Sequence, residues 1–300
     1  MTETFIGQGA TATAPLKSVT MTPSTQTQGV RVDVDVLYLD DIPGAMDQMG
    51  WNVSARLMRR WFATKPAWAM PEDWRSGKNI DYLHLPASLI EDQIVKMRWV
   101  LGFERMVPVF EELHQEWNNK PGLDQLKTRL EAAGWQSGRT LWLGKDLKTA
   151  KELDLSCQVN SRMFGESSDV LDDLYGAIFR ANLKLAVVGM TSRSIFSKRD
   201  LFEIEKIGIY VRDTYDFNAD WFNDAAFGLG IWSKSRVLSK REMLLYKAVP
   251  LPLLSRNFPG FVPARNEDFR RWQNQRNEGG DFYVFSDVMW LAPQVEYVYF

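Results

Sequence analysis

Cysteine and histidine are scarce in this chain of 300 residues, which has Cys157, His84 and His114 and no others. A single cysteine excludes an intrachain disulfide framework and is typical of proteins that fold in a reducing cytoplasm. With so few nitrogen and sulfur ligands, and no HExxH or CxxC spacing, no zinc site is expected. The same scarcity argues against a cysteine protease and against a histidine-based nuclease.

A strong excess of charge is lacking too, because the formal net charge is −2 and basic residues occur only in isolated pairs such as Arg59-Arg60 and Arg270-Arg271. We expect these pairs to be solvated or paired locally, and we predict no nucleic-acid partner. No apolar run approaches the roughly 18 residues of a transmembrane segment. The N-terminus lacks a Sec-type signal peptide. The sequence therefore predicts a protein that is cytoplasmic in the producing cell and exported, if at all, without a cleaved leader.

Several catalytic motifs are missing from the sequence. It has no GxxxxGK[ST] loop, and no GxGxxG follows a strand, so no nucleotide-binding motif is present. It also has no GxSxG sequence, which argues against an α/β-hydrolase. Aspartates remain as candidate ligands or acid–base groups, and Asp220, Asp224, Asp281 and Asp287 belong to this set. Their oxygens can bind Mg²⁺ or Ca²⁺, so the sequence identifies no cofactor but is compatible with a divalent cation such as Mg²⁺.

Apolar residues recur at steps of three or four in the first half of the chain, which predicts helices. The helices are expected over 44–62, 103–117, 123–134 and 168–182, whereas 94–101 fits a helix or a strand equally well. Trp61 closes the first stripe, and we assign it to the core. Most of the twelve tryptophans are expected to serve the core, with a surface aromatic patch as the alternative.

Extended segments dominate the second half of the chain. We expect strands over 183–190 and 204–216 and further extended segments at 229–232, 236–250, 281–290 and 295–300. This segregation predicts an α+β fold in which a helical N-terminal half packs on a mainly antiparallel sheet from the C-terminal half.

The N-terminal 30 residues are rich in Thr, Ser, Gln and Gly and poor in large apolar groups, which predicts a flexible tail over 1–30. Val32, Val34 and Val36 alternate with aspartates, and this pattern indicates a strand. No linker rich in Pro, Gly or Ser divides the rest of the chain. We therefore expect residues 31–300 to form a single compact domain, with a subdivision near 135–167 as the alternative.

The strongest functional signal lies at the end of the strand predicted over 204–216. Ile207, Ile209 and Val211 alternate with smaller or more polar residues, as in a half-buried strand. Asp213 and Tyr215 would follow on the apolar face, with Asp216 on the other face. Two carboxylates and a phenol would then meet where a rigid sheet passes into a loop, a common position for active sites. Asp213, Tyr215 and Asp216 are therefore the candidate catalytic residues.

A structural alternative exists for the same cluster. Asp216 and Asn218 are ordinary turn-forming residues. Asp213 would then pair with a nearby arginine. The residue types alone do not separate this interpretation from the catalytic one.

Two stretches of the sequence resemble a known group of proteins. The first holds Ile42-Pro43-Gly44-Ala45-Met46 and Leu57-Met58-Arg59-Arg60-Trp61-Phe62, and the second holds Val211-Arg212-Asp213-Thr214-Tyr215-Asp216-Phe217-Asn218, Leu229-Gly230-Ile231-Trp232 and Gly280-Asp281-Phe282-Tyr283-Val284-Phe285-Ser286-Asp287-Val288. Together they resemble an uncharacterised bacterial family, roughly 300 residues long, that is encoded beside type VI secretion genes. The resemblance covers about residues 32–300. It implies a secreted effector or an accessory protein and implies no particular reaction.

A weaker resemblance concerns Asp213-Thr214-Tyr215-Asp216 alone. Colicin M-like toxins, which cleave a lipid-linked precursor of peptidoglycan, carry Asp-x-Tyr-Asp at a strand end, followed by His-Arg. Here Phe222 and Asn223 stand where His-Arg would be expected, and no histidine follows residue 114. The general base of that site is thus missing or replaced.

The leading hypothesis is an antibacterial toxin effector of the type VI secretion pathway. Its reaction is unknown, and cell-envelope precursors are one candidate substrate. Its partners would be secretion spike proteins or a cognate immunity protein. The alternative is a non-enzymatic adaptor, chaperone or immunity protein of the same locus, which would present aromatic side chains as anchors.

Overall fold

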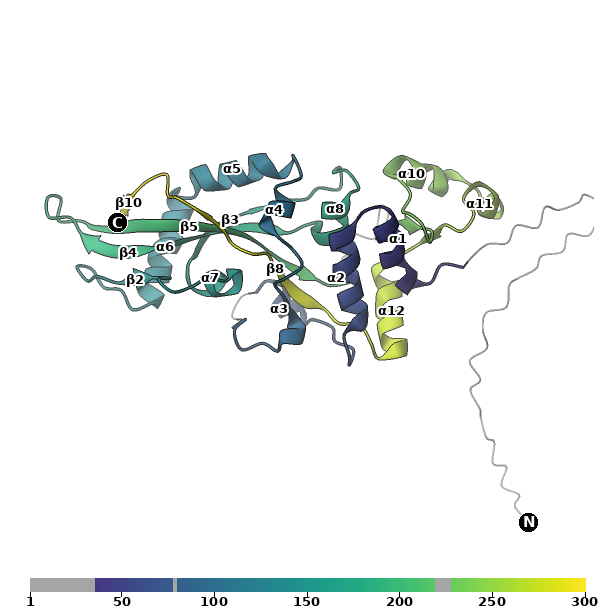
Figure 1. The fold of residues 1–300 in the computed structure, drawn as a ribbon, viewed down its shortest axis with the longest axis horizontal. Helices are drawn as coiled ribbons and strands as arrows, with labels where there is room; N and C mark the ends of the chain where they lie inside the picture. Colours follow the sequence, from purple (N-terminus) through teal and green to yellow (C-terminus); the bar gives the residue numbers. More distant parts are fainter. Residues whose placement is uncertain (1–35, 78–79, 219–227) are drawn as a thin grey trace, which may run out of the picture. The chain divides into compact units, whose positions relative to one another are not determined.

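The computed structural model describes residues 36–77, 80–218 and 228–300. The tail predicted over 1–30, most of the strand predicted at Val32–Val36, and Asp220, Phe222, Asn223 and Asp224 lie outside these residues. Helices dominate the N-terminal part of the described chain and a mainly antiparallel sheet follows, which confirms the α+β prediction (Figure 1). No helix within the described ranges has the length and apolar character needed to cross a bilayer.

The first helical stripe forms two helices, so the prediction of one helix over 44–62 was wrong. A 3₁₀ turn at Leu39–Asp41 leads into α1 (Ile42–Gln48), and α2 (Asn52–Ala63) follows after a sharp turn. The turn is made by Gly50, whose φ of +77° lies in the left-handed region that favours glycine. The apolar stripe nevertheless faces one core, because Met46, Val53 and Trp61 are all buried.

The remaining helices have between 3 and 13 residues. They are α3 (Glu72–Arg75), η2 (Ala87–Leu89), α4 (Met97–Val100), α5 (Met106–Glu116), α6 (Lys120–Ala132), α7 (Ala150–Ser156), α8 (Asp173–Ile178), α10 (Lys240–Ala248), α11 (Leu251–Asn257) and α12 (Asn266–Arg276). The expected end of α6 at Gly134 is confirmed, since this glycine has a φ of +89°. The segment that fitted either a helix or a strand contains α4.

One helix prediction and one prediction of an extended segment were wrong because of capping. The helix expected from Ser168 begins later, since the Asp172 carboxylate accepts a hydrogen bond from the Tyr175 backbone N–H and caps α8. The extended segment expected over 236–250 contains α10 instead. Ser239 and Glu242 form a reciprocal capping box at its start.

A long antiparallel hairpin forms the centre of the sheet. Strand order is β1-β8-β5-β4-β2, with β3 also paired to β4 and with β9 and β10 also paired to β5. The strands are β1 (Ile90–Glu91), β2 (Trp142–Leu143), β3 (Gln158–Met163), β4 (Asn182–Arg193), β5 (Asp200–Tyr215), β6 (Ile231–Trp232), β7 (Val262–Pro263), β8 (Phe282–Phe285), β9 (Met289–Leu291) and β10 (Tyr297–Tyr299). β1 and β8 are parallel, and β6 and β7 form a separate pair. The strands predicted over 183–190 and 204–216 are confirmed and are longer than expected.

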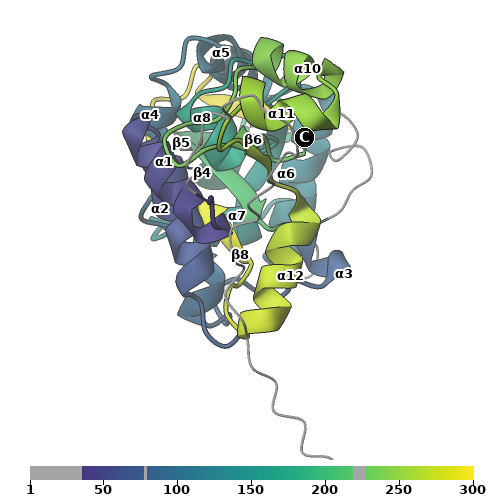
Figure 2. The same cartoon turned by 90° about the vertical axis from the view of Figure 1, so that its right-hand side faces the viewer.

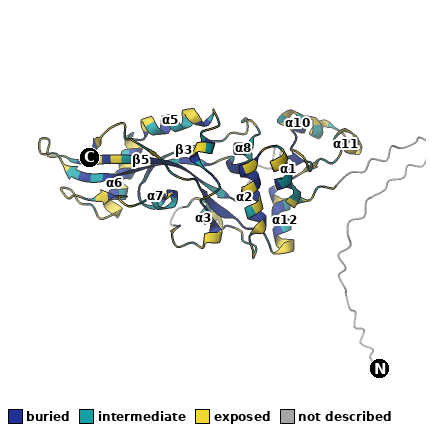
Figure 3. Cartoon of the chain, in the orientation of Figure 1, coloured by how far each residue is buried: buried dark blue, intermediate teal, exposed yellow. Residues whose placement is uncertain are grey.

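The middle of β5, residues 207–212, is buried on both faces rather than half-buried. Gly208, Tyr210 and Arg212 are buried as well as the isoleucines that alternate with them, as the dark stretch of β5 in Figure 3 shows. β4 and β8 flank this strand, and α7 packs on it. A central strand with covered faces can carry apolar or paired polar residues at every position, so strict alternation is not required.

Helices α2 and α12 run beside each other at one end of the sheet (Figures 1 and 2). The Trp61 ring contacts the Phe62 and Phe269 rings at centroid distances of 5.3 and 5.6 Å, and it reaches Phe217 just after β5 at 4.8 Å. Trp61 is fully buried, which confirms its assignment to the core. This aromatic cluster joins the N-terminal helices to the segment that follows the predicted catalytic residues.

Candidate functional site

Asp213, Tyr215 and Asp216 lie at the end of β5, where the sequence predicts them. β4 pairs with β5 only as far as Asn182 opposite Arg212, whereas β8 continues to the end of the strand. One edge of β5 is thus free of β4 beyond Arg212. Asp213 and Asp216 are partly exposed there, although the six residues before Asp213 are buried.

Tyr215 is built into the core by its ring. It lies opposite Phe282 in the β5–β8 register, and the two rings stack at 5.2 Å with an angle of 7° between their planes. Phe217 packs edge-on against the same ring at 5.6 Å. Burial raises the pKa of the Tyr215 hydroxyl above its usual value, so this phenol stays protonated at neutral pH.

The two carboxyl groups of the cluster are harder to ionise than ordinary aspartates. Burial raises the pKa of Asp213 to about 8, and the nearby Asp216 charge adds to this effect, while the Thr214 N–H and the Arg212 charge oppose it. Burial and the Asp281 charge raise the pKa of Asp216, against the opposing effects of Arg75, Thr214 and Asn218. Asp213 therefore carries a proton at pH 7 for most of the time and can act as a proton donor.

Asp216 is oriented by a local contact, since one of its carboxylate oxygens accepts a hydrogen bond of 2.5 Å from the Asn218 side-chain amide. This is the turn contact that the structural alternative expects. The other half of that alternative does not appear, because within the part of the chain that the structure describes Asp213 forms no ion pair with an arginine.

A buried arginine lies on the same strand, next to Asp213. Arg212 is 5% exposed, and its guanidinium donates a hydrogen bond of 3.0 Å to the Arg75 carbonyl and lies over the Tyr283 ring, 5.4 Å from its centroid. Among the described residues, no carboxylate forms an ion pair with it. Its positive charge therefore remains to act on Asp213, whose pKa it lowers in part.

Asp281, which the sequence suggested as a metal ligand or an acid–base group, is a fully buried structural residue. It accepts two hydrogen bonds from the Arg270 guanidinium, at 3.0 and 2.6 Å. It also accepts one from the Trp61 indole N–H at 2.9 Å and one from the Met70 backbone N–H at 2.8 Å. These four bonds satisfy the carboxylate. Asp287 also has a structural contact, since it accepts a hydrogen bond from the Met97 backbone N–H at 2.6 Å.

Arg270 links this ion pair to the candidate site, and sequence reasoning missed it. Besides Asp281, it donates to the Phe217 carbonyl at 2.8 Å and to the Asn218 side-chain oxygen at 3.1 Å. It thus fixes the two residues that follow Asp216. The signal in the sequence was the Arg270-Arg271 pair on a helix. Arg271 is paired locally with Asp268, as expected, but Arg270 faces inward.

A second buried charged group lies further along the sheet. The Lys184 ammonium and the Tyr210 hydroxyl both donate to one oxygen of Asp154, at 2.7 and 2.8 Å. Burial lowers the pKa of Lys184 and raises that of Tyr210. Cys157 lies nearby, and burial raises the pKa of its thiol to about 12, so it is no nucleophile at neutral pH. These groups stabilise the packing of α7 on the hairpin.

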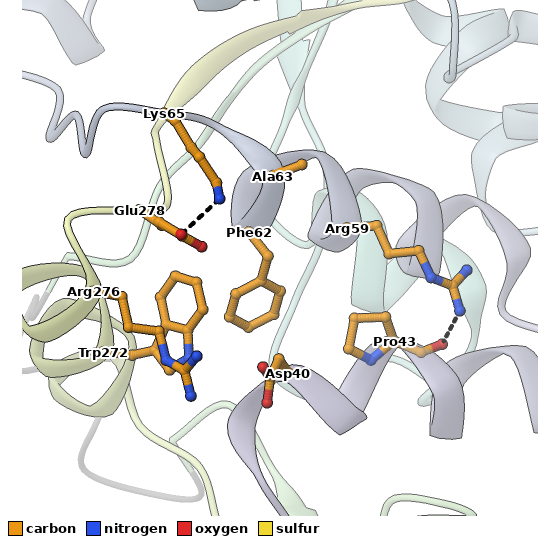
Figure 4. A pocket seen from close by; sticks show the side chains of 9 residues that line it. All are labelled: Asp40, Pro43, Arg59, Phe62, Ala63, Lys65, Trp272, Arg276 and Glu278. Atoms are coloured by element: carbon orange, nitrogen blue, oxygen red, sulfur yellow. Dashed lines mark hydrogen bonds and ion pairs between the residues drawn. The ribbon is translucent and has the colours of Figure 1, made fainter. Parts of the chain in front are cut away.

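A groove of about 410 Å³ opens between α1, α2 and α12 and is separate from the carboxyl cluster (Figure 4). It is lined by aromatic, apolar and charged side chains: Asp40, Pro43, Arg59, Phe62, Ala63, Lys65, Trp272, Arg276 and Glu278. Lys65 and Glu278 form an ion pair of 2.6 Å at its rim. None of the sequence-predicted site residues lines it. Within the described ranges, no group of three or more His, Cys, Asp or Glu residues is placed to hold a metal ion.

A family model matches this chain over nearly all of its described residues. The model of DUF6402, described as a family of unknown function, matches residues 37–299. The matched region includes both sequence stretches that resemble an uncharacterised bacterial family, and this family-level resemblance is confirmed. Neither a curated protein nor a solved structure matches the chain.

Proposed function

We propose that this chain, which belongs to the DUF6402 family of unknown function, is an antibacterial effector delivered by type VI secretion. In this proposal it performs acid–base chemistry at Asp213 and Asp216. The delivery route rests on the resemblance of Ile42–Phe62 and Val211–Asn218 to proteins encoded beside type VI secretion genes. The chemistry rests on the carboxyl pair.

The observation that carries the chemistry is the position of Asp213 and Asp216, two partly exposed carboxyl groups at the end of β5 where β4 no longer covers its edge, and burial of these groups raises their pKa. Asp213, with a pKa of about 8, is the proton donor, and Asp216 is the group that accepts a proton or orients a water molecule. Enzymes commonly hold acid–base groups in such environments. The substrate class in this proposal is a cell-envelope precursor, which rests on the weaker resemblance of Asp213-Thr214-Tyr215-Asp216 to colicin M-like toxins.

Expression in a susceptible bacterium, separately in the cytoplasm and directed to the periplasm, tests this proposal. The parent should be toxic in one compartment, and Asp213→Asn and Asp216→Asn should remove the toxicity because they remove the groups that transfer the proton. Asp146→Asn is the matched control, since Asp146 is exposed and lies on a distant loop.

Melting temperatures of the three purified variants separate a catalytic from a structural role. They should stay within a few degrees of that of the parent. Full toxicity in both site variants, or loss of toxicity only together with a large fall in melting temperature, would contradict the catalytic role.

A non-enzymatic role in the same locus is the second candidate, and one exposed feature favours it. The turn between β4 and β5 presents Ile195 and Phe196, which are 79% and 99% exposed. A hydrogen-bonded turn between Ser194 and Arg199 holds them at the tip of a rigid hairpin. Such an aromatic side chain is an anchor for a protein partner. If the chain is an immunity protein, co-expression should protect cells from the toxin of a neighbouring gene, and Phe196→Ser should abolish the protection.

A further inference from the structure

Helices α10 and α11 expose an unusual number of leucines. Leu244 and Leu245 on α10 are 60% and 54% exposed, and Leu251 and Leu253 on α11 are 83% and 45% exposed. All four lie within ten residues of sequence. Isolated exposed leucines are ordinary, but four exposed leucines on two successive helices indicate an interaction surface.

These leucines are not needed for the packing of the hairpin itself. The inward side of α10 is made by Met243, which is buried, and by Tyr246, whose ring packs against Phe258 at 5.3 Å. The Ser239 capping box and the bidentate ion pair of Arg236 with Glu242 fix the start of α10. The leucines therefore project from a hairpin that is held in place by other residues.

The charge of this hairpin is opposite to that of the chain. Residues 239–257 contain four basic residues and one acidic residue, whereas the whole chain has a net charge of −2. Arg241 lies three residues before Leu244 on α10, and Arg256 lies on α11. Both are exposed, and neither forms an ion pair with any described residue. The surface is therefore complementary to an anionic partner.

The composition favours a bilayer over a protein as that partner. Protein interfaces concentrate their binding energy in tryptophan, tyrosine and arginine and are depleted in lysine. No aromatic side chain of α10 or α11 is exposed, and the surface combines leucines with the exposed Lys247 and the two arginines. Leucine beside Lys and Arg is the composition of helices that lie in the interface of an anionic membrane.

We propose that α10 and α11 form a docking surface for an anionic lipid bilayer, with the four leucines entering the interface and the basic residues lying among the headgroups. The two helices have nine and seven residues, so they lie on the membrane and do not cross it. The proposal is independent of the proposed function, because it assigns no role to Asp213 or Asp216.

Co-flotation of the full-length protein with vesicles tests the proposal directly. The protein should float with vesicles of phosphatidylglycerol and phosphatidylethanolamine and stay in solution with pure phosphatidylcholine vesicles. Leu251→Gln combined with Leu253→Gln should weaken binding by about 10-fold or more, since it removes apolar area that enters the interface. Arg241→Glu should weaken binding by roughly 5-fold or more, and 0.5 M salt should weaken binding of the parent.

Matched controls keep the result specific to this surface. Ile195→Gln with Phe196→Gln removes a similar apolar area from the exposed hairpin tip, and Arg98→Glu reverses a distant exposed charge. Neither should change binding by more than about two-fold, and all variants should melt like the parent. Three results would overturn the proposal: no binding to anionic vesicles, equal loss in the controls, or a dimer in light scattering that the leucine variant dissociates.

Discussion

Asp213 on β5 and Asp281 just before β8 differ in chemistry because their surroundings differ. Asp281 is fully buried but accepts four hydrogen bonds, two of them from Arg270, and these stabilise its charge. At Asp213 burial disfavours the charge, and no ion-pair partner among the described residues offsets this effect, so its pKa rises although it is more exposed than Asp281. The same residue type is therefore structural at position 281 and a candidate acid at position 213.

The raised pKa of Asp213 makes a prediction about stability and pH. The unfolded chain ionises this group near its ordinary value of 3.8, whereas the folded protein holds the proton up to a pKa of about 8. Between these values the folded state binds more protons, so the contribution of Asp213 to stability falls as the pH rises from about 4 to about 8. Between pH 5 and pH 8.5 the melting temperature of the parent should fall by more than that of Asp213→Asn. An equal fall in the two proteins would contradict the prediction.

The Asp281–Arg270 pair is expected to stabilise the fold. Asp281→Asn leaves the half-buried Arg270 guanidinium without its carboxylate, which should destabilise the fold by about 3–5 kcal/mol. Chemical denaturation measures this loss. Asp124→Asn is the control, because Asp124 forms an exposed pair with Lys120 and should cost less than about 1 kcal/mol. Equal costs for the two variants would show that the buried pair is not a stabilising link.

At the scale of elements, caps and glycines set the boundaries that periodicity alone does not reveal. Met46, Val53 and Trp61 follow one apolar stripe, yet the stripe runs over two helices because Gly50 turns the chain between them. The reciprocal bonds between Ser239 and Glu242 likewise start a helix in a segment whose residues favoured an extended form. Local side-chain-to-backbone hydrogen bonds decide such cases.

Two glycines of this region provide a matched test of the turn. An added Cβ meets no atom within 4 Å at either Gly44 or Gly50, so an alanine fits without a steric clash at both positions. Gly44 lies within α1, and Gly44→Ala should stabilise the protein by about 0.5 kcal/mol. Gly50 has a φ of +77°, and Gly50→Ala should destabilise it by about 1–2 kcal/mol. Denaturation midpoints measure both, and a stabilising Gly50→Ala would show that the turn is not strained.

At the scale of the whole molecule, one aromatic cluster connects the helical part to the sheet. Trp61 of α2 contacts Phe269 of α12 and Phe217 beyond β5, and its indole N–H reaches Asp281 before β8. These contacts span the chain from residue 61 to residue 281. They support the proposal that residues 31–300 form one domain.

Unfolding of the parent should therefore be a single transition seen alike by far-ultraviolet and near-ultraviolet circular dichroism. Trp61→Ala should lower the free energy of unfolding by about 3–5 kcal/mol, because it removes a fully buried ring. The variant should still unfold in one step. Two separate transitions, with only one of them shifted by the variant, would instead support the subdivision near 135–167.

The sequence by itself determined the fold class, the core position of Trp61 and the place of Asp213, Tyr215 and Asp216 at a strand end. These follow from periodicity and from the segregation of helices and strands, which are local properties of the chain. Only the tertiary structure decided which polar groups are paired. Arg270 meets Asp281 and fixes Asn218, while Asp213 has no ion-pair partner among the described residues. Partners from different elements set the burial and charge around each group, and no spacing in the sequence encodes those contacts.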